Sequence, residues 1–459
     1  MTLSLDVKKI EHIVGSENIL TDTVDLVVYS SDATPIKSRP NIVIFPTTTQ
    51  QVSDIMKYAS ANRIPVVPRG AGSSLSGGPV AIKGGIILDF TKMNKILNVD
   101  TDNFEVLVEP GVVYKTLEKK LKPLGLFFPP DPSSQDWCTI GGMIAENAGG
   151  MRAVKYGVTR DWVMGLEVVL SNGDVAWFGS STYKFASGYE MHRLIVGSEG
   201  TLAIITKALL KVTTLPEARL TAIAYFKTLE DAGKCVYETI RRGLQPSGAE
   251  IMDRLTMDAV SKFTGIKFPE CGAVVVNELD GDQDSVKKRL KILEEIYKHN
   301  NAISYAIAKD EHEAEKIFES RHAAYSALST YKPTTELEDV TVPISKVPEM
   351  FKRIEEISKK YGIMIATFGH MGDGNLHPNI LYDEKIPEEK EKAELVKEEI
   401  FRAALDLKGT ITGEHGVGCT KIKFFGIEHS SCSVNAQKAV KKALDPYNIL
   451  NPGKIFGEM

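Results

Sequence analysis

Residues 139–150 are the stretch that most limits how this chain can fold. Six of these twelve positions are glycine or alanine, in the order Thr-Ile-Gly-Gly-Met-Ile-Ala-Glu-Asn-Ala-Gly-Gly. A backbone with so few side chains can be approached closely, which larger residues would prevent. Further glycine-rich loops stand at Pro68–Gly78 and Gly197–Thr206. Together they predict a backbone surface against which a flat or bulky group packs.

The first of these loops follows a predicted β-α-β unit. Apolar strands are expected at residues 41–46 and 64–67, and Val52, Ile55 and Met56 between them have helical spacing. The loop offers hydroxyls and backbone N–H groups unobstructed by Cβ atoms, which suits a pyrophosphate. It matches neither the Rossmann fingerprint nor the P-loop, so on its own it could equally be a surface turn.

Composition excludes several classes of protein. A length of 459 residues predicts two or three domains, and a net charge of −5 without a basic block gives no support to nucleic-acid binding. The five cysteines form no CxxC pair, which argues against iron–sulfur clusters, zinc ribbons and disulfide frameworks. No run approaches eighteen apolar residues and no signal-peptide region is visible, so we expect no membrane span. The expected location is cytoplasmic, with peripheral membrane association as the alternative.

Histidines and a carboxylate gather in two later loops. His370 and His377 flank a tight Gly-Asp-Gly turn after a strand-like run at residues 363–368, and Glu414 and His415 lie between glycines further on. Two histidines and a carboxylate are a ligand set for a catalytic divalent metal, and a fourth group beside them could act as a base. The alternative is ordinary hydrogen-bonded histidines in glycine-rich loops. Four such groups in two loops, out of nine histidines in the chain, favour an active site.

The order of the motifs resembles a known family. The first half is similar to the FAD domain of vanillyl-alcohol-oxidase-type (PCMH-type) flavoproteins, through the motifs Pro68–Gly72, Pro130–Pro132, Gly141–Gly142, Asn147–Gly150 and Gly197–Gly200. The second half resembles one branch of it, through Gly369–His377, Gly413–Gly418 and Asn451–Lys454. That branch holds FAD-linked D-lactate dehydrogenases, the glycolate oxidase flavoprotein subunit and D-2-hydroxyglutarate dehydrogenase. The resemblance covers roughly residues 36–456.

The resemblance implies FAD lying across residues 68–78, 130–150 and 197–206. Many relatives bind FAD covalently through a histidine in the first loop, where this chain has Ser73 and Ser74, so a non-covalent flavin is implied. The residues expected to bind it are Pro68, Arg69, Gly70, Ala71, Gly72, Ser73, Ser74, Ser76, Gly77, Pro130, Asp131, Pro132, Ser133, Gly141, Gly142, Ala145, Asn147, Gly149, Gly150, Tyr156, Gly157, Glu199, Gly200, Ile205 and Asn451.

The expected fold is α+β. A two-part PCMH-type FAD domain is expected at residues 1–215, a substrate (cap) domain with the metal ligands at 216–408, and a segment returning to the FAD domain at 409–459. Two β-α-β patterns after Pro216 predict a ferredoxin-like cap with a large antiparallel sheet. Residues 311–328 are expected to form one amphipathic helix carrying Arg321 and Tyr325.

The resemblance assigns a role to each site residue. His370, His377 and Glu414 would bind one Zn²⁺, Fe²⁺ or Mn²⁺, and His415 would take the substrate hydroxyl proton. Asn379 would donate to the substrate, which is a small 2-hydroxy acid. Arg321 would bind its carboxylate, with Tyr325 facing the same way. The alternatives are a surface charge for Arg321 and core packing for Tyr325.

The stretch before Pro343 bears on the substrate. Residues 336–339 read Glu-Leu-Glu-Asp and hold no lysine where 2-hydroxyglutarate dehydrogenases carry one. A monocarboxylate is therefore favoured, with D-lactate oxidation to pyruvate first and glycolate as the alternative. The D configuration rests on resemblance alone.

Electrons would leave through a separate acceptor: an electron-transferring flavoprotein, a cytochrome, a quinone or an iron–sulfur subunit. A homodimer or a hetero-complex would accommodate this. A non-redox FAD transferase and a non-catalytic electron-transfer subunit are the competing classes, and the intact metal motif argues against both.

Overall fold

The computed structural model describes residues 5–458 and divides them into two compact units. The first unit contains the chain through Gly149, residues 158–215, and the segment from Glu414 onward. The second contains Gly150–Gly157 and Pro216–Gly413. Within the described part of the chain, no helix combines the length and the apolar character needed to cross a membrane.

The first unit begins with a four-stranded sheet in the order β1-β2-β4-β3. Its strands are β1 (Ile19–Leu20), β2 (Ile42–Ile44), β3 (Val66–Arg69) and β4 (Ile86–Asp89). β2 and β3 both pair in parallel with β4, so β4 separates the two strands of the expected β-α-β unit. Sequence spacing identifies a β-α-β unit, but it cannot reveal a later strand inserted between its two strands.

Successive side chains along these strands point to opposite faces of the sheet, and an apolar layer covers each face. Ile42 and Ile44 pack with α1 (Val7–Val14) and α3 (Thr49–Asn62), whereas Val43 faces a second cluster with Leu26 of α2 (Thr23–Val28). Helix α3 begins where the Thr48 side chain accepts a hydrogen bond from the Gln51 N–H, as its sequence predicts. The sheet is therefore buried on both faces, which leaves the loops at its ends to carry function.

A five-stranded antiparallel sheet, in the order β5-β6-β10-β8-β9, completes the first unit. Its strands are β5 (Ile96–Asp100), β6 (Glu105–Val108), β8 (Val163–Val169), β9 (Val175–Gly179) and β10 (Ile204–Lys211). A short pair joins β7 (Leu126–Phe127) to β11 (Thr213–Thr214). The helices are α4 (Tyr114–Leu121), α5 (Ile140–Glu146), α7 (Met191–Ile195), α15 (Ile422–Glu428) and α16 (Ser431–Leu444).

The C-terminal segment is tied into the first sheet by backbone hydrogen bonds. The Val66 N–H donates to the Ile449 carbonyl at 2.7 Å, and the Asn451 N–H donates to the Val66 carbonyl at 2.8 Å. This segment therefore extends the sheet beside β3, immediately before the glycine-rich loop at residues 70–78.

The second unit is built on an eight-stranded antiparallel sheet. Its strands are β12 (Ala218–Phe226), β13 (Gly248–Asp253), β14 (Ala273–Gly281), β15 (Ala302–Ile307), β16 (Thr334–Leu337), β17 (Val340–Thr341), β18 (Met364–His370) and β19 (Asn375–Tyr382). The order β15-β12-β14-β13 is the fourth, first, third and second strand of a ferredoxin-like unit, as predicted, and β18, β19 and β16 extend it.

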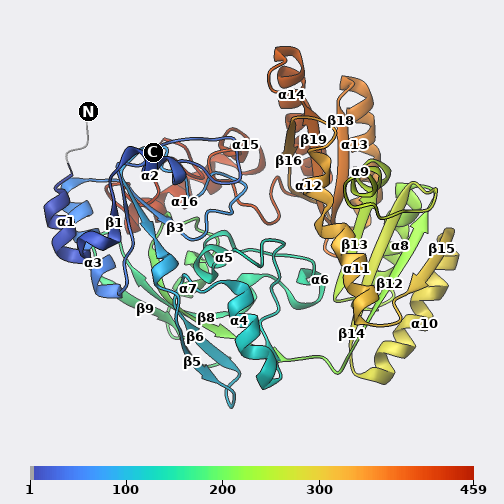
Figure 1. Cartoon of the computed structure of the whole chain (residues 1–459), viewed down its shortest axis with the longest axis horizontal. Coiled ribbons are helices and arrows are strands. Elements are labelled where there is room, and N and C mark those ends of the chain that lie inside the picture. Colours follow the sequence, from blue (N-terminus) through green and yellow to red (C-terminus); the bar gives the residue numbers. More distant parts are fainter. Residues whose placement is uncertain (1–4, 459) are drawn as a thin grey trace. The chain divides into compact units, whose positions relative to one another are not determined.

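Helices cover both faces of this sheet (Figure 1). Helices α9 (Arg254–Thr264), α11 (Glu311–His322) and α12 (Ala324–Leu328) share an apolar cluster with Phe368 and Ala366. The opposite face is covered by α8 (Leu229–Arg241), α10 (Gln283–His299), α13 (Val347–Tyr361) and α14 (Pro387–Asp406). On that face the Tyr297 hydroxyl of α10 donates a hydrogen bond to Asn277 Oδ1. The short helix α6 (Ala153–Tyr156) belongs to this unit, beside β13.

The single helix expected at residues 311–328 is wrong. The chain forms α11 and α12 as separate helices, with Ala323 between them. Apolar spacing continues across the break, so periodicity alone could not show the interruption at Ala323.

Lys441 provides a test of how the first unit is held together. Its buried ammonium group pairs with Asp445 and donates to the carbonyls of Thr201 and Leu450. Lys441→Met leaves the Asp445 carboxylate buried without its counter-charge, so we expect a loss of about 3–5 kcal/mol in unfolding free energy. Chemical denaturation measures the loss. The exposed neighbour Lys442 provides the control, Lys442→Met, which should change stability by less than about 0.5 kcal/mol. Equal effects in the two variants would contradict the assignment.

Candidate functional site

Strand register places the candidate site residues on one face of the second unit's sheet. Glu250 of β13 stands opposite His370 of β18, and Phe368 of β18 stands opposite His377 of β19. Asn379 is two positions beyond His377. Residues directly opposite each other in an antiparallel pair, and residues two apart along a strand, share a face. The side chains of these five residues, Glu250, Phe368, His370, His377 and Asn379, therefore project to the same side of the sheet.

The two histidines meet because β18 and β19 form a hairpin. Their ring centroids are 5.2 Å apart, the rings are nearly perpendicular, and both side chains are buried. Gly374 closes the turn at a φ of +86°, and a Cβ there would lie 2.0 Å from the Val342 carbonyl oxygen. Only glycine fits this position, so the Gly-Asp-Gly sequence is required for the approach of the two imidazoles.

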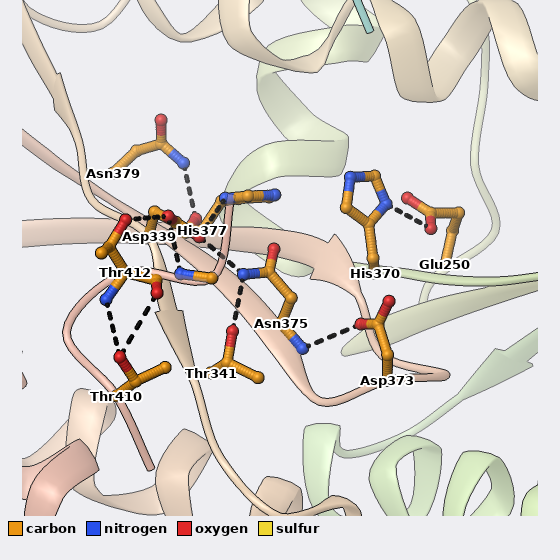
Figure 2. Close-up of polar contacts among 11 residues, drawn as sticks. Glu250, Asp339, Thr341, His370, Asp373, Asn375, His377, Asn379, Thr410 and Thr412 are labelled. Carbon is orange, nitrogen blue, oxygen red and sulfur yellow. Dashed lines mark hydrogen bonds and ion pairs between the residues drawn. The ribbon is translucent and has the colours of Figure 1, made fainter. Parts of the chain in front are cut away.

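Glu250 is a functional candidate that the sequence analysis did not find. Its Oε1 lies 2.7 Å from His370 Nδ1, and its Oε2 accepts a hydrogen bond from Arg321 Nε at 2.7 Å (Figure 2 shows the His370 contact). Burial raises the pKa of this carboxyl, but His370 and Arg321 together outweigh burial and hold the pKa below its usual value. Glu250 is therefore an anion that bridges two predicted site residues. No local motif marks it, since its partners are 120 and 71 positions away.

Arg321 is buried and only partly satisfied by the protein. Its guanidinium carbon lies 4.3 Å from the centre of the Phe368 ring, and its side chain is 7% exposed. Among residues 5–458 its only hydrogen bond is the one from Nε to Glu250. The two terminal nitrogens are therefore left as a planar donor pair, the geometry that suits a carboxylate.

Asp339 organises the loop that precedes Glu414 and His415 (Figure 2). Its buried carboxylate accepts hydrogen bonds from Asn375 Nδ2 at 2.6 Å, Thr412 Oγ1 at 2.8 Å and the Gly413 N–H at 2.9 Å. A Cβ at Gly413 would lie 2.2 Å from Thr341 Oγ1, so the loop passes too close for a larger residue. The sequence analysis noted Asp339 only as part of an acidic stretch.

The donor set in this unit fits a metal ion. Ring nitrogens of His370 and His377 lie within 4.8 Å of each other, and an Asp339 oxygen lies within the same distance of His377. Neutral imidazole nitrogens and a carboxylate oxygen suit Zn²⁺, Fe²⁺ or Mn²⁺. Glu414 and His415 follow Gly413 directly in the chain but belong to the other compact unit, so their roles stay predictions.

Asn379 and Tyr325 differ from their expected settings. The Asn379 amide nitrogen donates to the carbonyls of His377 at 2.7 Å and Ala366 at 3.3 Å, while its buried Oδ1 has no partner among the described residues. As placed, this amide presents an acceptor to the site rather than a donor. Tyr325 lies in α12, beyond the helix break, and is 38% exposed, so it is not a core residue.

The glycine-rich segments of the first unit are joined to one another by buried polar side chains. Lys454 Nζ donates to the carbonyls of Gly77 and Val80, both at 2.7 Å. Asn451 Nδ2 donates to the carbonyls of Gly78 at 3.0 Å and Glu199 at 2.7 Å. Loops distant in sequence thus form one framework, as a large cofactor such as FAD requires.

Two glycines of this framework confirm how tightly its backbone packs. A Cβ at Gly141 would lie 2.7 Å from Pro110 Cβ, and one at Gly70 would lie 2.2 Å from Thr139 Oγ1. Glu146 Oε2, at the end of α5, is buried and has no hydrogen-bond partner in the described part of the chain. The two glycines let protein segments pack together, and the unsatisfied buried oxygen of Glu146 fits a polar cofactor beside them.

Glu199 holds the loop that follows His415. Its carboxylate accepts hydrogen bonds from the N–H groups of Val417 and Gly418, each at 2.8 Å. Burial raises its pKa to about 6, and the pKa of nearby Glu146 is raised well above its usual value by burial and by Glu199. Glu199 was expected to contact the cofactor; its carboxylate binds backbone here, and its assignment to the cofactor stays a prediction.

Arg69 and Tyr156, both expected at the cofactor, also have protein partners. Arg69 Nη1 donates to the Ser31 carbonyl at 3.0 Å, and its guanidinium lies over the Tyr29 ring. The Tyr156 hydroxyl lies 2.6 Å from Asp280 Oδ2 within the second unit. Their assignment to the cofactor stays a prediction.

Comparison with known proteins agrees with these features. The family model described as "FAD binding domain" matches residues 40–179, and "FAD linked oxidases, C-terminal domain" matches residues 215–455. Glycolate oxidase subunit GlcD of Bacillus subtilis is 43% identical over 459 residues, covering 99% of this chain and 98% of the relative. The D-lactate dehydrogenase of Archaeoglobus fulgidus is 37% identical, over 94% of this chain and 96% of the relative. The mitochondrial D-lactate dehydrogenase (cytochrome) of Arabidopsis thaliana is 34% identical, over 91% and 73%.

Solved structures share the fold at low sequence identity. p-Cresol methylhydroxylase superposes with a TM-score of 0.81 at 19% identity, over 98% of this chain and 96% of that chain. An alkyldihydroxyacetonephosphate synthase gives a TM-score of 0.75 at 18% identity, over 98% and 86%. The FAD-binding domain and the cap with its large antiparallel sheet are thus those of PCMH-type flavoproteins. The chain belongs to the FAD-linked oxidases, in the branch that holds glycolate oxidase GlcD and the D-lactate dehydrogenases.

Proposed function

We propose that this protein oxidises a small D-2-hydroxy monocarboxylate, with D-lactate to pyruvate as the leading reaction and glycolate oxidation as the alternative. Its branch of FAD-linked oxidoreductases carries out FAD-dependent oxidation of 2-hydroxy acids. The observation that carries the proposal is the buried Arg321, whose terminal nitrogens are left for a carboxylate on the face that bears His370 and His377. The relatives named for glycolate and for D-lactate both support this substrate class.

The preference for a monocarboxylate rests on Leu337. This residue stands opposite Asn379 across β16 and β19, so it shares the face of the histidines. Its side chain packs beside the apolar cluster that includes Phe368. A second substrate carboxylate would meet an apolar surface there, and burying it without a partner is unfavourable.

The acidic neighbours of Leu337 point away from this face. Lys397 of α14 pairs with Glu336, and its Nζ lies 3.9 Å from Glu338, on the opposite side of the sheet. Glu336 and Glu338 therefore do not face a second carboxylate, whereas Asp339, the last residue of the acidic stretch, lies beside His377. What supports the monocarboxylate is the apolar residue between the two acids.

The proposed reaction uses two cofactors. FAD, bound non-covalently in the glycine-rich framework of the first unit, would accept the two electrons. A divalent metal, bound by His370, His377 and Glu414, would supply a Lewis acid that makes a hydroxyl easier to deprotonate. Asp339 is an additional oxygen donor beside His377.

The protein's own side chains would perform the remaining steps. Arg321 binds the substrate carboxylate through its terminal nitrogens, which fixes the orientation of the carbon that is oxidised. His415 takes the hydroxyl proton, because neutral imidazole is well suited to this near pH 7. Asn379 and Tyr325 are the further substrate contacts that we propose.

Electrons would pass to a separate acceptor. One relative is named as a subunit and another for a cytochrome, which supports an acceptor protein in a complex of more than one chain. The non-redox transferase is the weaker alternative, because the synthase of that class is similar in fold at only 18% identity.

The function is tested by mixing the FAD-loaded protein anaerobically with D-lactate, L-lactate, glycolate and D-2-hydroxyglutarate. We expect D-lactate to bleach the flavin absorbance fastest, glycolate more slowly, and the dicarboxylate least, because Leu337 offers it no partner. Absence of bleaching by every acid would contradict the redox function and favour the transferase. Fastest bleaching by D-2-hydroxyglutarate would contradict the role of Leu337.

The role of His415 is tested with His415→Ala. Loss of a positioned base should slow the limiting rate of flavin reduction by D-lactate by about 10²–10⁴, whereas the apparent dissociation constant for lactate should change little. Stopped-flow reduction at a series of lactate concentrations measures both quantities. His12 is exposed on α1, so His12→Ala is the matched control and should behave as wild type. A wild-type limiting rate in His415→Ala would show that another group takes the proton.

A further inference from the structure

We infer that Glu250 is a positioning residue that fixes the metal-binding face of His370 and the substrate-binding face of Arg321 at the same time. The inference rests on the proposed function, because it assumes that His370 binds metal and that Arg321 binds a carboxylate. One buried carboxylate would thus hold the metal-binding histidine and the carboxylate-binding arginine in fixed positions relative to each other.

The geometry leaves Glu250 little freedom. Its side chain is 1% exposed, and each of its oxygens contacts a different partner at 2.7 Å. Its strand, β13, is interior to the sheet, paired with β14 on one side and with β18 on the other. The partners come from a strand and from a helix, so only a fixed carboxylate can serve both.

The contact with His370 determines which ring nitrogen is available. An ionised carboxylate can only accept hydrogen bonds, so His370 Nδ1 must carry the hydrogen in this contact. In the neutral imidazole, Nε2 is then the unprotonated nitrogen, and it is the atom that can bind a metal. A carboxylate partner also makes the imidazole a better donor to the metal and fixes its orientation.

The contact between Glu250 and Arg321 determines which guanidinium nitrogens remain available to a substrate. Glu250 occupies Nε, and the Phe368 ring lies against the guanidinium plane. The terminal nitrogens are thereby held in one orientation rather than sampling several. A preorganised donor pair loses less entropy on binding a carboxylate than a mobile one does.

Glu278 offers a control for a purely structural role. It lies on β14, and its neighbour two positions back, Val276, stands opposite Glu250, so both glutamates share a face. Glu278 is also buried, at 7% exposure, and its Oε1 accepts a hydrogen bond from Ser247 Oγ at 2.8 Å. No contact joins it to His370 or Arg321 in the described part of the chain.

The first experiment measures metal affinity directly, without turnover. Glu250→Gln and Glu278→Gln are titrated with Zn²⁺ against a coloured chelator, with FAD content and far-UV circular dichroism measured on the same samples. We expect Glu250→Gln to bind Zn²⁺ about 10–100-fold more weakly than wild type, the usual effect of removing a hydrogen-bond partner of a ligating histidine. Glu278→Gln should bind as wild type does. Unchanged affinity in Glu250→Gln, or equal weakening in both variants, overturns the inference.

The second experiment separates the Arg321 contact from the metal. At saturating Zn²⁺, we expect the apparent dissociation constant for D-lactate to rise about 10-fold or more in Glu250→Gln, the scale for a misplaced charge-assisted bond. Glu278→Gln should leave it unchanged. An unchanged lactate affinity in Glu250→Gln overturns the part of the inference that concerns Arg321.

Glu250→Gln could fail to fold, because that change leaves the Arg321 charge buried and unpaired. A third variant keeps the inference testable in that case. The double variant Glu250→Gln/Arg321→Met removes both charges, and it should still bind Zn²⁺ about 10–100-fold more weakly because His370 has lost its anionic partner. Wild-type Zn²⁺ affinity in the double variant overturns the inference. If no 2-hydroxy acid reduces the wild-type flavin but Zn²⁺ binding depends on Glu250, the proposed function fails and the His370 contact stands.

Discussion

The antiparallel pairing of β13, β18 and β19 is the constraint on which the candidate site depends. Glu250 opposite His370 and Phe368 opposite His377 bring side chains from three strands to one face. A slip of one residue in either pairing would send half of them to the other side of the sheet. The register is held by the apolar cluster under α9 and α12 and by the glycine turn at residues 372–374. The same face thereby carries the core at one end and the polar site at the other.

Three buried carboxylates, Glu250 and Asp253 in the second unit and Glu199 in the first, titrate differently because their partners differ. Burial raises the pKa of a carboxyl, whereas positive charges and hydrogen-bond donors nearby lower it. Glu250 faces a guanidinium and a histidine, so its pKa is lowered. Glu199 accepts mainly from backbone N–H groups, and burial raises its pKa to about 6. Burial likewise raises the pKa of Asp253, the N-cap of α9, to about 6, because its hydrogen bonds from Thr256 and Thr367 only partly offset burial. Of the three carboxyls, Glu250 alone has its pKa held below the usual value.

Much of the fold and part of the site could be predicted from sequence, because local patterns encode them. The hairpin that joins His370 and His377 follows from an apolar run, a Gly-Asp-Gly turn and strand spacing, and the cap topology follows from alternating strands and helices. Glu250 could not be predicted, because its partners lie 71 and 120 residues away and no motif surrounds it. Asp339 was hidden in an acidic stretch whose members point to opposite faces. The break at Ala323 and the insertion of β4 between β2 and β3 were missed because apolar spacing records neither a short interruption of a helix nor the order of strands in a sheet.

The central claim is that one face of the second unit's sheet binds a metal and a carboxylate through residues fixed by Glu250. The most direct measurement is a crystal structure of the Mn²⁺-loaded protein soaked with oxalate, which carries carboxylates but no hydroxyl to oxidise, with anomalous scattering to locate the metal. The account predicts an anomalous peak within bonding distance of His370 Nε2 and His377, with Glu250 still hydrogen-bonded to His370 Nδ1 and an oxalate carboxylate on the terminal nitrogens of Arg321. A metal bound away from both histidines, or Arg321 turned away from the bound carboxylate, would contradict it.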